Sequence, residues 1–297
     1  MRKIIIMLDS TCDMSPEMLE KYDVEYIPMG VSIGDKEYPA TLEWKDFKPS
    51  EYYKIMESGT RVFTIQVSEQ QFTERFTKIL DEGNDVIYIS CSSGLSGSIH
   101  MAEIARKKVL EGRTEGKIIC IDSLISGLGQ AMMGIRASEL RAEGKDIEEI
   151  GKVIEDEKMY YNQWGTVGNL TYLAKAGRVK ASKAFFGNLF GVKPIIISSV
   201  KGANVAYKKV KGRKAAIEEL AQSVANTIAD SENRIVGITN ADCPEDAEQL
   251  KQLIIAKGVK CKEIVISSLG PILGASCGPK TLIAYNYGKK KDYLGDE

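Results

Sequence analysis

Histidine is almost absent from this chain of 297 residues, which contains only His100. A catalytic serine or cysteine usually relies on a histidine as its general base, and zinc sites usually draw on histidines or clustered cysteines. The six cysteines form no Cys-x-x-Cys pair and no Cys/His cluster. We therefore expect buried, reduced thiols and no structural metal, and we interpret His100 as a surface or packing residue of a helix.

Long apolar runs and an excess of either charge are also missing. The first apolar run ends at Asp9, too early for a signal peptide, and no stretch approaches the ~20 apolar residues that a membrane-spanning helix needs. The 40 basic and 41 acidic residues give a formal net charge of -1. This balance provides no electrostatic reason for a nucleic-acid partner or for attraction to an anionic membrane. We expect a cytoplasmic protein without stable membrane insertion.

The first half of the chain alternates apolar runs with helical patterns. The segments "KIIIMLDS", "DVIYISCS" and "KIICIDS" are apolar enough to be buried strands, and each leads into a helical pattern. Ser15 before Pro16, and the capping box formed by Ser68 and Gln71, mark two helix starts. Continuous apolar strands between amphipathic helices predict a mostly parallel sheet with helices on both of its faces.

The second half of the chain shows a different order of predicted strands and helices. The segment "VKPIIISSVKGANVAYKKV" predicts a hairpin that turns at residues 201–204, and further strands and helices follow it. A length of 297 residues suggests two domains, at about 100–200 residues each. The predicted fold class is therefore α/β, with an N-terminal domain at residues 1–160 and a C-terminal domain with a mixed sheet at residues 161–297.

Four polar loops are expected beyond the carboxyl ends of the strands, where parallel sheets bind their ligands. They are residues 9–13, 64–68, 92–98 and 122–123. The loop at residues 92–98, "SSGLSGS", combines four serine hydroxyls with two glycines just before a helix start. Such a loop offers hydroxyls, N–H groups and the positive end of a helix dipole to an anion. A capped turn without a ligand would use the same residues.

The stretch "GASCG" at residues 274–278 fits the Gly-x-Ser-x-Gly nucleophile elbow of serine hydrolases. The rest of the chain argues against that interpretation. His100 precedes Ser276, whereas the elbow enzymes place their histidine after the serine, and Pro279 with a β-rich segment follows where the elbow needs a helix. A serine-dependent acyl or ester hydrolase acting through Ser276 or Ser96 stays as the enzymatic alternative.

Taken in order, these loops resemble those of the DegV family, whose members bind fatty acids and include the fatty-acid-binding subunit of bacterial fatty acid kinase. The resemblance covers essentially the whole chain. Besides the four loops, it rests on "LAKAGRV" before "GNLFGVKPII" and on Gly278-Pro279. It implies that one fatty acid lies buried between two α/β domains, with its carboxylate held by Thr64 and Ser96 and helped by basic residues and a histidine.

The chain departs from the family pattern at several of these positions, three of which are expected site residues. Ser276 stands where the family has its histidine, Lys211 where an arginine is usual, and Ile65 where a serine is usual. The expected carboxylate-binding residues are Thr64, Ser96, Ser276, Lys211 and Arg178. The expected supporting residues are Ser93, Gly97, Ile65, Asp9 and Ser10. The candidate lining of the tail, for which ordinary core packing is the alternative, is Phe185, Phe186, Phe190, Met132 and Met133.

The resemblance makes physical sense. A carboxylate buried without partners would be costly or would protonate, so hydroxyls and a cation are needed around it. Each buried methylene of an acyl tail contributes ~0.8 kcal/mol. We expect a lipid-binding protein of phospholipid metabolism, not an enzyme, whose ligand is a long-chain fatty acid and which uses no cofactor. A separate ATP-dependent fatty acid kinase is the expected partner, and a carrier of another small anion is the remaining alternative.

Overall fold

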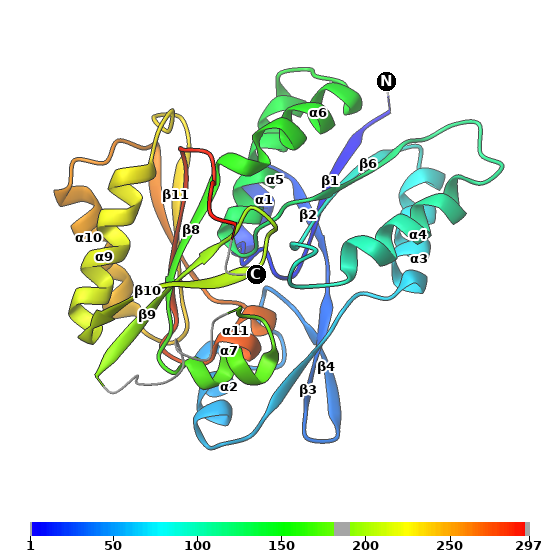
Figure 1. The fold of residues 1–297 in the computed structure, drawn as a ribbon. Coiled ribbons are helices and arrows are strands. Elements are labelled where there is room, and N and C mark those ends of the chain that lie inside the picture. The colour runs from blue at the N-terminus through cyan, green and yellow to red at the C-terminus, as the bar shows by residue number, and fades with distance from the viewer. Residues whose placement is uncertain (1, 181–190, 295–297) are drawn as a thin grey trace.

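The computed structural model describes residues 2–180 and 191–294, which form three β-sheets and the helices around them (Figure 1). The larger sheets have four and six strands and belong to the two halves of the chain, and the third sheet has three strands. The predicted α/β class with two differently built halves is confirmed.

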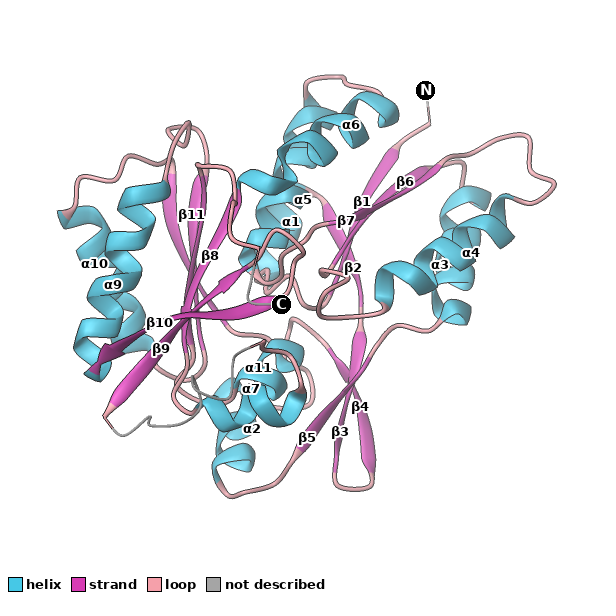
Figure 2. Ribbon diagram, in the orientation of Figure 1, coloured by secondary structure: helices cyan, strands magenta, loops and turns pink. Residues whose placement is uncertain are grey.

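The sheet of the N-terminal half is parallel, with strand order β2-β1-β6-β7. Its strands are β1 (Ile4–Asp9), β2 (Val24–Ile27), β6 (Asp85–Ser90) and β7 (Ile118–Asp122). Every residue of β1 and β6 is buried, which explains their continuous apolar sequence. Helices cover both faces, as predicted (Figure 2). One face carries α3 (Glu69–Asp81) and α4 (Ser98–Leu110), and the other carries α1 (Pro16–Tyr22), α5 (Leu128–Ala142) and α6 (Ile147–Glu157).

The sheet of the C-terminal half is mixed, with strand order β10-β9-β8-β13-β11-β12. Its strands are β8 (Tyr161–Thr166), β9 (Val192–Ser198), β10 (Asn204–Lys211), β11 (Ile235–Asn240), β12 (Glu263–Ser268) and β13 (Leu282–Tyr287). Among these six described strands, only β11 and β12 pair in parallel. The hairpin that turns at residues 201–204 is confirmed, because Ser198 pairs with Asn204. The outer face packs against α9 (Gly212–Thr227) and α10 (Pro244–Ala256).

The third sheet was missed by the sequence analysis. It is antiparallel, in the order β4-β3-β5, with α2 (Pro49–Glu57), α7 (Leu170–Ala176) and α11 (Pro271–Cys277) gathered beside it (Figure 1). Its strands are β3 (Met29–Ile33), β4 (Lys36–Ala40) and β5 (Val62–Ile65). Thr64 and Ile65 therefore lie on an edge strand, and the prediction that residues 64–68 form a loop beyond a parallel strand was wrong for these two residues.

Helix α5 lies between the two large sheets (Figure 1). It contacts β1, β2 and β6 on one side and β8, β11 and β13 on the other. Met132 and Met133, which we considered for the lining of an acyl tail, belong to this helix and are buried in the core. The sandwiched position of α5 explains why both side chains serve packing between the sheets.

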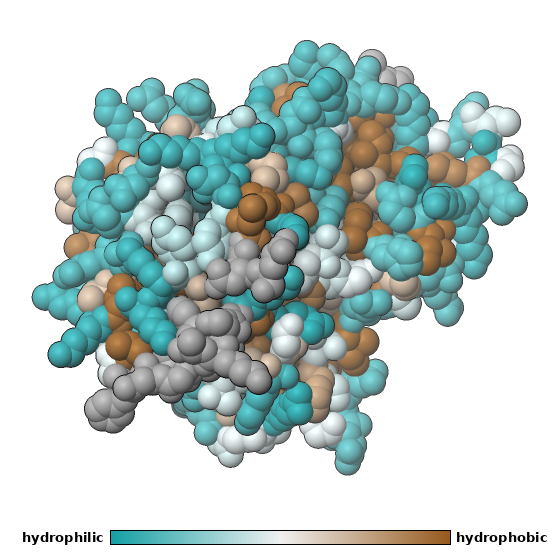
Figure 3. Space-filling model, viewed as in Figure 1, coloured by the Kyte–Doolittle hydropathy of each residue, from teal (hydrophilic) through white to brown (hydrophobic). Residues whose placement is uncertain are grey.

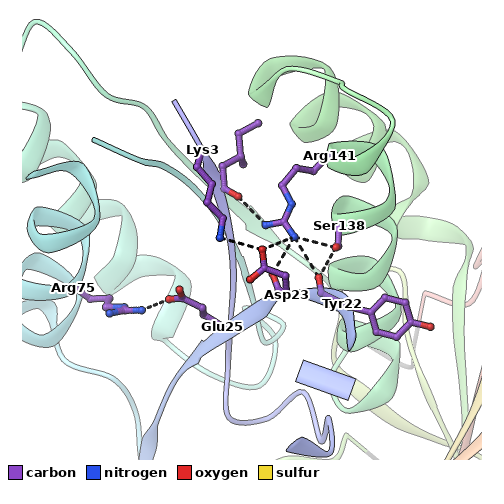
Figure 4. A network of polar contacts seen from close by, with 8 residues as sticks. Lys3, Tyr22, Asp23, Glu25, Arg75, Ser138 and Arg141 are labelled. Atoms are coloured by element: carbon purple, nitrogen blue, oxygen red, sulfur yellow. Dashed lines mark hydrogen bonds and ion pairs between the residues drawn. The ribbon is translucent and has the colours of Figure 1, made fainter. Parts of the chain in front are cut away.

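Arg141 fixes the end of α5 to the N-terminal edge of the parallel sheet (Figure 4). Its guanidinium donates to the carbonyl oxygens of Ile4 (2.9 Å) and Asp23 (3.1 Å) and pairs with the Asp23 carboxylate (3.2 Å). The same carboxylate lies 3.1 Å from the Lys3 ammonium. Asp23 caps α1 in a left-handed conformation, so the network holds the turn between α1 and β2 against α5.

The loop after β1 reaches across to the C-terminal half through Asp13. One of its carboxylate oxygens accepts the Gly270 N–H at 2.8 Å, and its carbonyl oxygen accepts the Ser267 hydroxyl at 2.8 Å. The other carboxylate oxygen, Oδ2, is buried and has no partner among the described residues. Burial raises the pKa of the Asp13 carboxyl well above its ordinary range, and the nearby Asp9 adds to the rise. Asp13 thus anchors the start of α11 with a carboxyl that favours its neutral form.

We predict that Asp13→Asn stabilises the protein increasingly as the pH rises. Asparagine keeps an oxygen for the Gly270 N–H and tolerates the left-handed backbone of this position (φ 55°). Because burial raises the folded-state pKa above the unfolded-state value of about 3.9, the contribution of Asp13 is fully present below about pH 3.9 and is lost as the pH rises from there towards the folded-state pKa. The variant should gain ~1.4 kcal/mol over the wild type for each pH unit in this window. Urea unfolding between about pH 4 and 8 measures the difference, and parallel pH profiles would contradict the prediction.

Candidate ligand-binding site

A cavity of about 160 Å³ lies between the two halves of the molecule. Its walls come from the loops after β1 and β6, from the side of the mixed sheet that faces the N-terminal half, and from α11. A single buried water needs roughly 10–15 Å³ by the same measure, so the space is roughly ten times larger than a water site. A space much larger than a water site therefore lies between the two halves, and its use by a ligand stays a prediction.

A second cavity, of about 330 Å³, adjoins the first. Its walls come mainly from residues 59–64 and from α7 with the residues that follow it. The two cavities share Thr64, Arg178 and Ser276 as lining residues. We call the place where these three residues meet the junction.

Four of the five residues predicted to bind a carboxylate line the first cavity: Thr64, Ser96, Arg178 and Ser276. Ser96 lies at the start of α4, where its hydroxyl oxygen accepts the Ser98 N–H at 3.2 Å. Ser276 occupies the last turn of α11, a helix that the sequence analysis did not foresee. Residues far apart in the chain thus converge on one end of the cavity, and their binding of a carboxylate stays a prediction.

Arg178 connects the two halves at the junction. It follows α7, which ends at Gly177 in a left-handed conformation (φ 66°). The guanidinium donates through Nε to the Leu95 carbonyl oxygen (2.8 Å) and through Nη1 to the Ala176 carbonyl oxygen (2.8 Å). These two bonds fix the orientation of the cation and leave further N–H groups for a ligand.

The surroundings of the junction are electropositive. Arg61 and Lys175 line the second cavity together with Arg178. The Arg61 guanidinium lies 4.3 Å from the centroid of the Phe63 ring and donates to the Lys175 carbonyl oxygen (3.3 Å). No aspartate or glutamate is found among the described residues that line either cavity. Three cations without an acidic neighbour in the walls favour an anionic group at the junction.

Lys211 was wrongly predicted as part of this site. It is exposed at the last position of β10, next to α9, and lines neither cavity. Asn204, at the other end of the same strand, does line the first cavity. At ~3.3 Å per residue, the length of the strand carries Lys211 roughly 23 Å away from Asn204.

Asp9 and Ser10 support the cavity from behind its wall. The Asp9 carboxylate accepts the Thr11 hydroxyl (2.5 Å) and the Cys91 N–H (2.8 Å), and the Ser10 hydroxyl oxygen accepts the Met29 N–H (2.9 Å). Thr11, Cys91 and Met29 all line the first cavity, whereas Asp9 and Ser10 are fully buried behind them. Asp9 and Ser10 therefore influence the shape of the cavity indirectly, because their hydrogen bonds hold Thr11, Cys91 and Met29 in place.

The other three supporting residues also lie outside the cavity lining. Ser93 is exposed, and its N–H donates to the Asp122 carboxylate at 3.0 Å. Gly97 precedes α4, and a Cβ at this position would lie 2.6 Å from the side-chain oxygen of Gln66. The absence of a side chain at Gly97 thus lets Gln66 approach the serine-glycine loop. Ile65 is partly exposed on the edge strand β5.

The lining away from the junction differs from the predicted apolar tunnel. Met132 and Met133 do not line the cavity, and Phe185, Phe186 and Phe190 lie outside the described residues. The described walls combine apolar residues such as Ile196 and Ile283 with polar ones. Thr11 and Gln66 belong to two of the predicted polar loops, whereas Ser126, Gln163, Thr166, Asn204 and Thr281 were missed by the sequence analysis. Those on strands, Gln163, Thr166 and Asn204, belong to no motif that the sequence analysis recognised.

The described walls of the two cavities offer no catalytic base to a serine nucleophile. No histidine, aspartate or glutamate is found among the described lining residues, and His100 is exposed on α4. The cavity thiols are also unsuited to nucleophilic chemistry. Burial raises the pKa of Cys277 to about 12 and raises the pKa of Cys91 strongly as well. Within the described residues, no cluster of three or more histidine, cysteine, aspartate or glutamate side chains could hold a metal ion.

In the described parts of the chain, no helix is long and apolar enough to cross a membrane. The face of the molecule in Figure 3 is largely hydrophilic, with smaller hydrophobic areas between the polar side chains.

Comparison with known proteins places the chain in a family. A family model described as "Uncharacterised protein, DegV family" matches residues 3–286. The chain belongs to the DegV family. It is 30% identical over 292 residues to the DegV domain-containing protein CPE0026 of Clostridium perfringens, covering 98% of this chain and 100% of that protein.

Solved DegV structures share the fold over nearly the whole chain. A fatty-acid-binding DegV family protein from Thermus thermophilus superimposes with a TM-score of 0.87 at 25% identity, covering 97% of this chain and 100% of the other. A stearic-acid-binding protein from Eubacterium ventriosum gives a TM-score of 0.83 at 25% identity, covering 96% and 98%. Structural neighbours of this DegV chain are thus proteins described as binding fatty acids.

We predict that the cavity thiols are inert in the folded protein. With a pKa near 12, the Cys277 thiol is ionised about a thousandfold less at pH 8 than an ordinary thiol. Alkylation by iodoacetamide, followed by peptide mass spectrometry, should modify Cys91 and Cys277 at least ~100-fold more slowly in the native protein than in urea. Rapid labelling of either residue in the native protein would contradict the burial of these thiols and their raised pKa values. Cys261, which is only partly buried, is the internal comparison.

Proposed function

We propose that this DegV protein binds one long-chain fatty acid, with the carboxylate at the junction and the tail in the first cavity. The observation that carries the proposal is the convergence of Thr64, Ser96, Ser276 and Arg178 at one end of an internal space between the two halves. Neighbours of the same fold that bind fatty acids support it. On this proposal Lys211 takes no part in binding.

The energetics of the site agree with such a ligand. A carboxylate needs hydrogen-bond donors and a cation when it leaves water, and the junction supplies hydroxyls and a guanidinium. The hydrocarbon gains ~0.8 kcal/mol for each methylene that it buries against the apolar wall residues. Much of this gain is lost to immobilisation of the ligand, so we expect affinity in the micromolar range or tighter.

We further propose that the protein binds the fatty acid and presents it to another protein, and that it is not itself an enzyme. The described cavity walls provide hydroxyls and cations but no general base, which favours holding a carboxylate over attacking an ester. A separate ATP-dependent fatty acid kinase in the cytoplasm would then convert the presented carboxylate to an acyl phosphate. In this scheme the second cavity gives access to the head group, because it meets the first cavity at the junction.

The direct test is to extract and identify the ligand. Denaturation of the purified protein, followed by mass spectrometry, should release one long-chain acid for each chain. After delipidation, a C16 or C18 acid at 100 times its dissociation constant should stabilise the fold by ~2.7 kcal/mol, or raise the melting temperature by about 5 °C. An empty extract together with an unchanged melting temperature would refute the proposal.

The role of Arg178 can be separated from general electrostatics by a matched pair of variants. Arg178→Gln should weaken fatty-acid binding at least ~10-fold, because it removes a charged hydrogen-bond donor at the head group. Lys211→Gln removes the same charge at an exposed position outside both cavities and should leave the affinity unchanged. Displacement of a fluorescent fatty acid measures both. Equal losses in the two variants would contradict the assignment of the cation.

Ser276→His tests whether the serine at the junction sets the pH dependence of binding. An imidazole at this position has an ordinary pKa of ~6.5 and becomes a second cation at lower pH. We expect the variant to bind fatty acid progressively more tightly below about pH 6.5, whereas the wild type should show no such step. A variant that keeps its melting temperature but has the pH profile of the wild type would contradict this prediction.

A further inference from the structure

The second cavity carries more positive charge than the head group of a fatty acid uses. Its described lining contains Arg61, Lys175 and Arg178 but neither an aspartate nor a glutamate. A carboxylate has a single negative charge, and the proposed function places it beside Arg178. Arg61 and Lys175 are exposed, and neither forms an ion pair among the described residues. Two cations of this cavity therefore have no role in holding the acid.

Arg61 and Lys175 come from two segments that meet beside the second cavity. Arg61 precedes β5 and lies three residues before Thr64, so at ~3.3 Å per residue its backbone is roughly 10 Å from that junction residue. Its guanidinium lies over the Phe63 ring and donates to the carbonyl oxygen of Lys175, in the last turn of α7. A ligand that reaches both the junction and Arg61 must therefore have a spacer between its two polar groups.

Neutral donors line the same cavity. Thr60, Asn169 and Thr171 line the second cavity but not the first. The side-chain oxygen of Asn169 accepts the Thr171 N–H at 2.9 Å, which leaves the N–H groups of the Asn169 amide for a ligand. The cavity measures about 330 Å³ against about 160 Å³ for the first, so it has room for a head group larger than a carboxylate.

A phosphate monoester matches this set of groups better than a carboxylate does. It carries about 1.5 to 2 negative charges at pH 7 and has three strong acceptor oxygens. Arginine binds phosphate oxygens through paired N–H groups, and lysine binds them as a point charge. With no acidic side chain in the described lining, nothing there opposes a doubly charged group.

We propose that the second cavity binds a phosphate monoester at Arg61 and Lys175. The ligand class is a single-chain lipid whose phosphate is separated from the acyl group by a short polar spacer, and a 1-acylglycerol 3-phosphate is a simple example. This inference rests on the proposed function, because it places the chain in the first cavity and the acyl carbonyl group at the junction. Such a lipid fills both cavities and therefore excludes the free fatty acid.

The experiment measures displacement of a fluorescent fatty acid from the delipidated, full-length protein. Three competitors share one acyl chain: tetradecanoic acid, 1-tetradecanoylglycerol and 1-tetradecanoylglycerol 3-phosphate. We expect the phosphate-bearing lipid to bind at least about tenfold more tightly than the acylglycerol, and salt to reduce this gain. Glycerol 3-phosphate and inorganic phosphate lack the chain and should leave the probe bound. Displacement by either of them at the concentration that suffices for the lipid would overturn the assignment to a lipid.

A pair of variants separates these cations from general electrostatics. Lys175→Gln should weaken the phosphate-bearing lipid at least about fivefold more than it weakens tetradecanoic acid or the acylglycerol. Lys211→Gln removes the same charge outside both cavities and should leave all three affinities in the same ratio. Arg61→Gln provides a second test if Lys175→Gln lowers the melting temperature.

The outcomes distinguish this inference from the proposed function. If tetradecanoic acid binds but the phosphate adds nothing to the affinity of the acylglycerol, the phosphate site alone is overturned. Unchanged ratios in folded Lys175→Gln and Arg61→Gln proteins would also overturn it. Failure of all three chain-bearing competitors to displace the probe would overturn the proposed function together with the phosphate site.

Discussion

The burial of α5 between two sheets is the constraint on which the arrangement of the molecule depends. One side of the helix covers the parallel sheet and the other side contacts the mixed sheet, so the two halves share one continuous hydrophobic core. Their relative position is therefore set by close packing rather than by a flexible linker. An internal cavity walled by both halves can keep a defined shape only if that position is fixed, and Asp13 adds a direct bond from the first loop to the start of α11.

The polar residues around the cavity serve two different purposes. Buried groups such as the Asp9 carboxylate are satisfied by the protein itself and hold wall residues in place. Groups at the junction, such as the Arg178 guanidinium, keep hydrogen-bonding capacity for a ligand. Only groups of the second kind can contribute to recognition, because a group that is already bonded gains little from a ligand. This distinction separates Asp9, whose carboxylate is fully used within the protein, from Arg178, whose two hydrogen bonds leave further N–H groups for a ligand.

The sequence supports the prediction of the larger architecture, because continuous apolar strands and capped helices are local patterns. It also places Thr64, Ser96, Arg178 and Ser276 near one another, through the order of the loops and the resemblance to the DegV family. Lys211 was assigned wrongly because the length of β10, which separates it from the cavity, is not part of any motif. The small antiparallel sheet escaped prediction because Pro28 divides one apolar run between two sheets. The polarity of Gln163 is plain in the sequence, but its hydrogen bond to Asn204 appears only when β8 and β10 are placed in one sheet.

The order of the site residues along the chain has a consequence for folding. Thr64 and Ser96 come from the first half, whereas Arg178 and Ser276 come from the second half, and the last of these precedes only the final strand, β13. Bringing such distant segments together requires that most of the chain has already been ordered. The candidate site thus depends on contacts between residues far apart in the chain, and neither half contains all four residues. A ligand held there would favour the completed molecule over every partly folded intermediate.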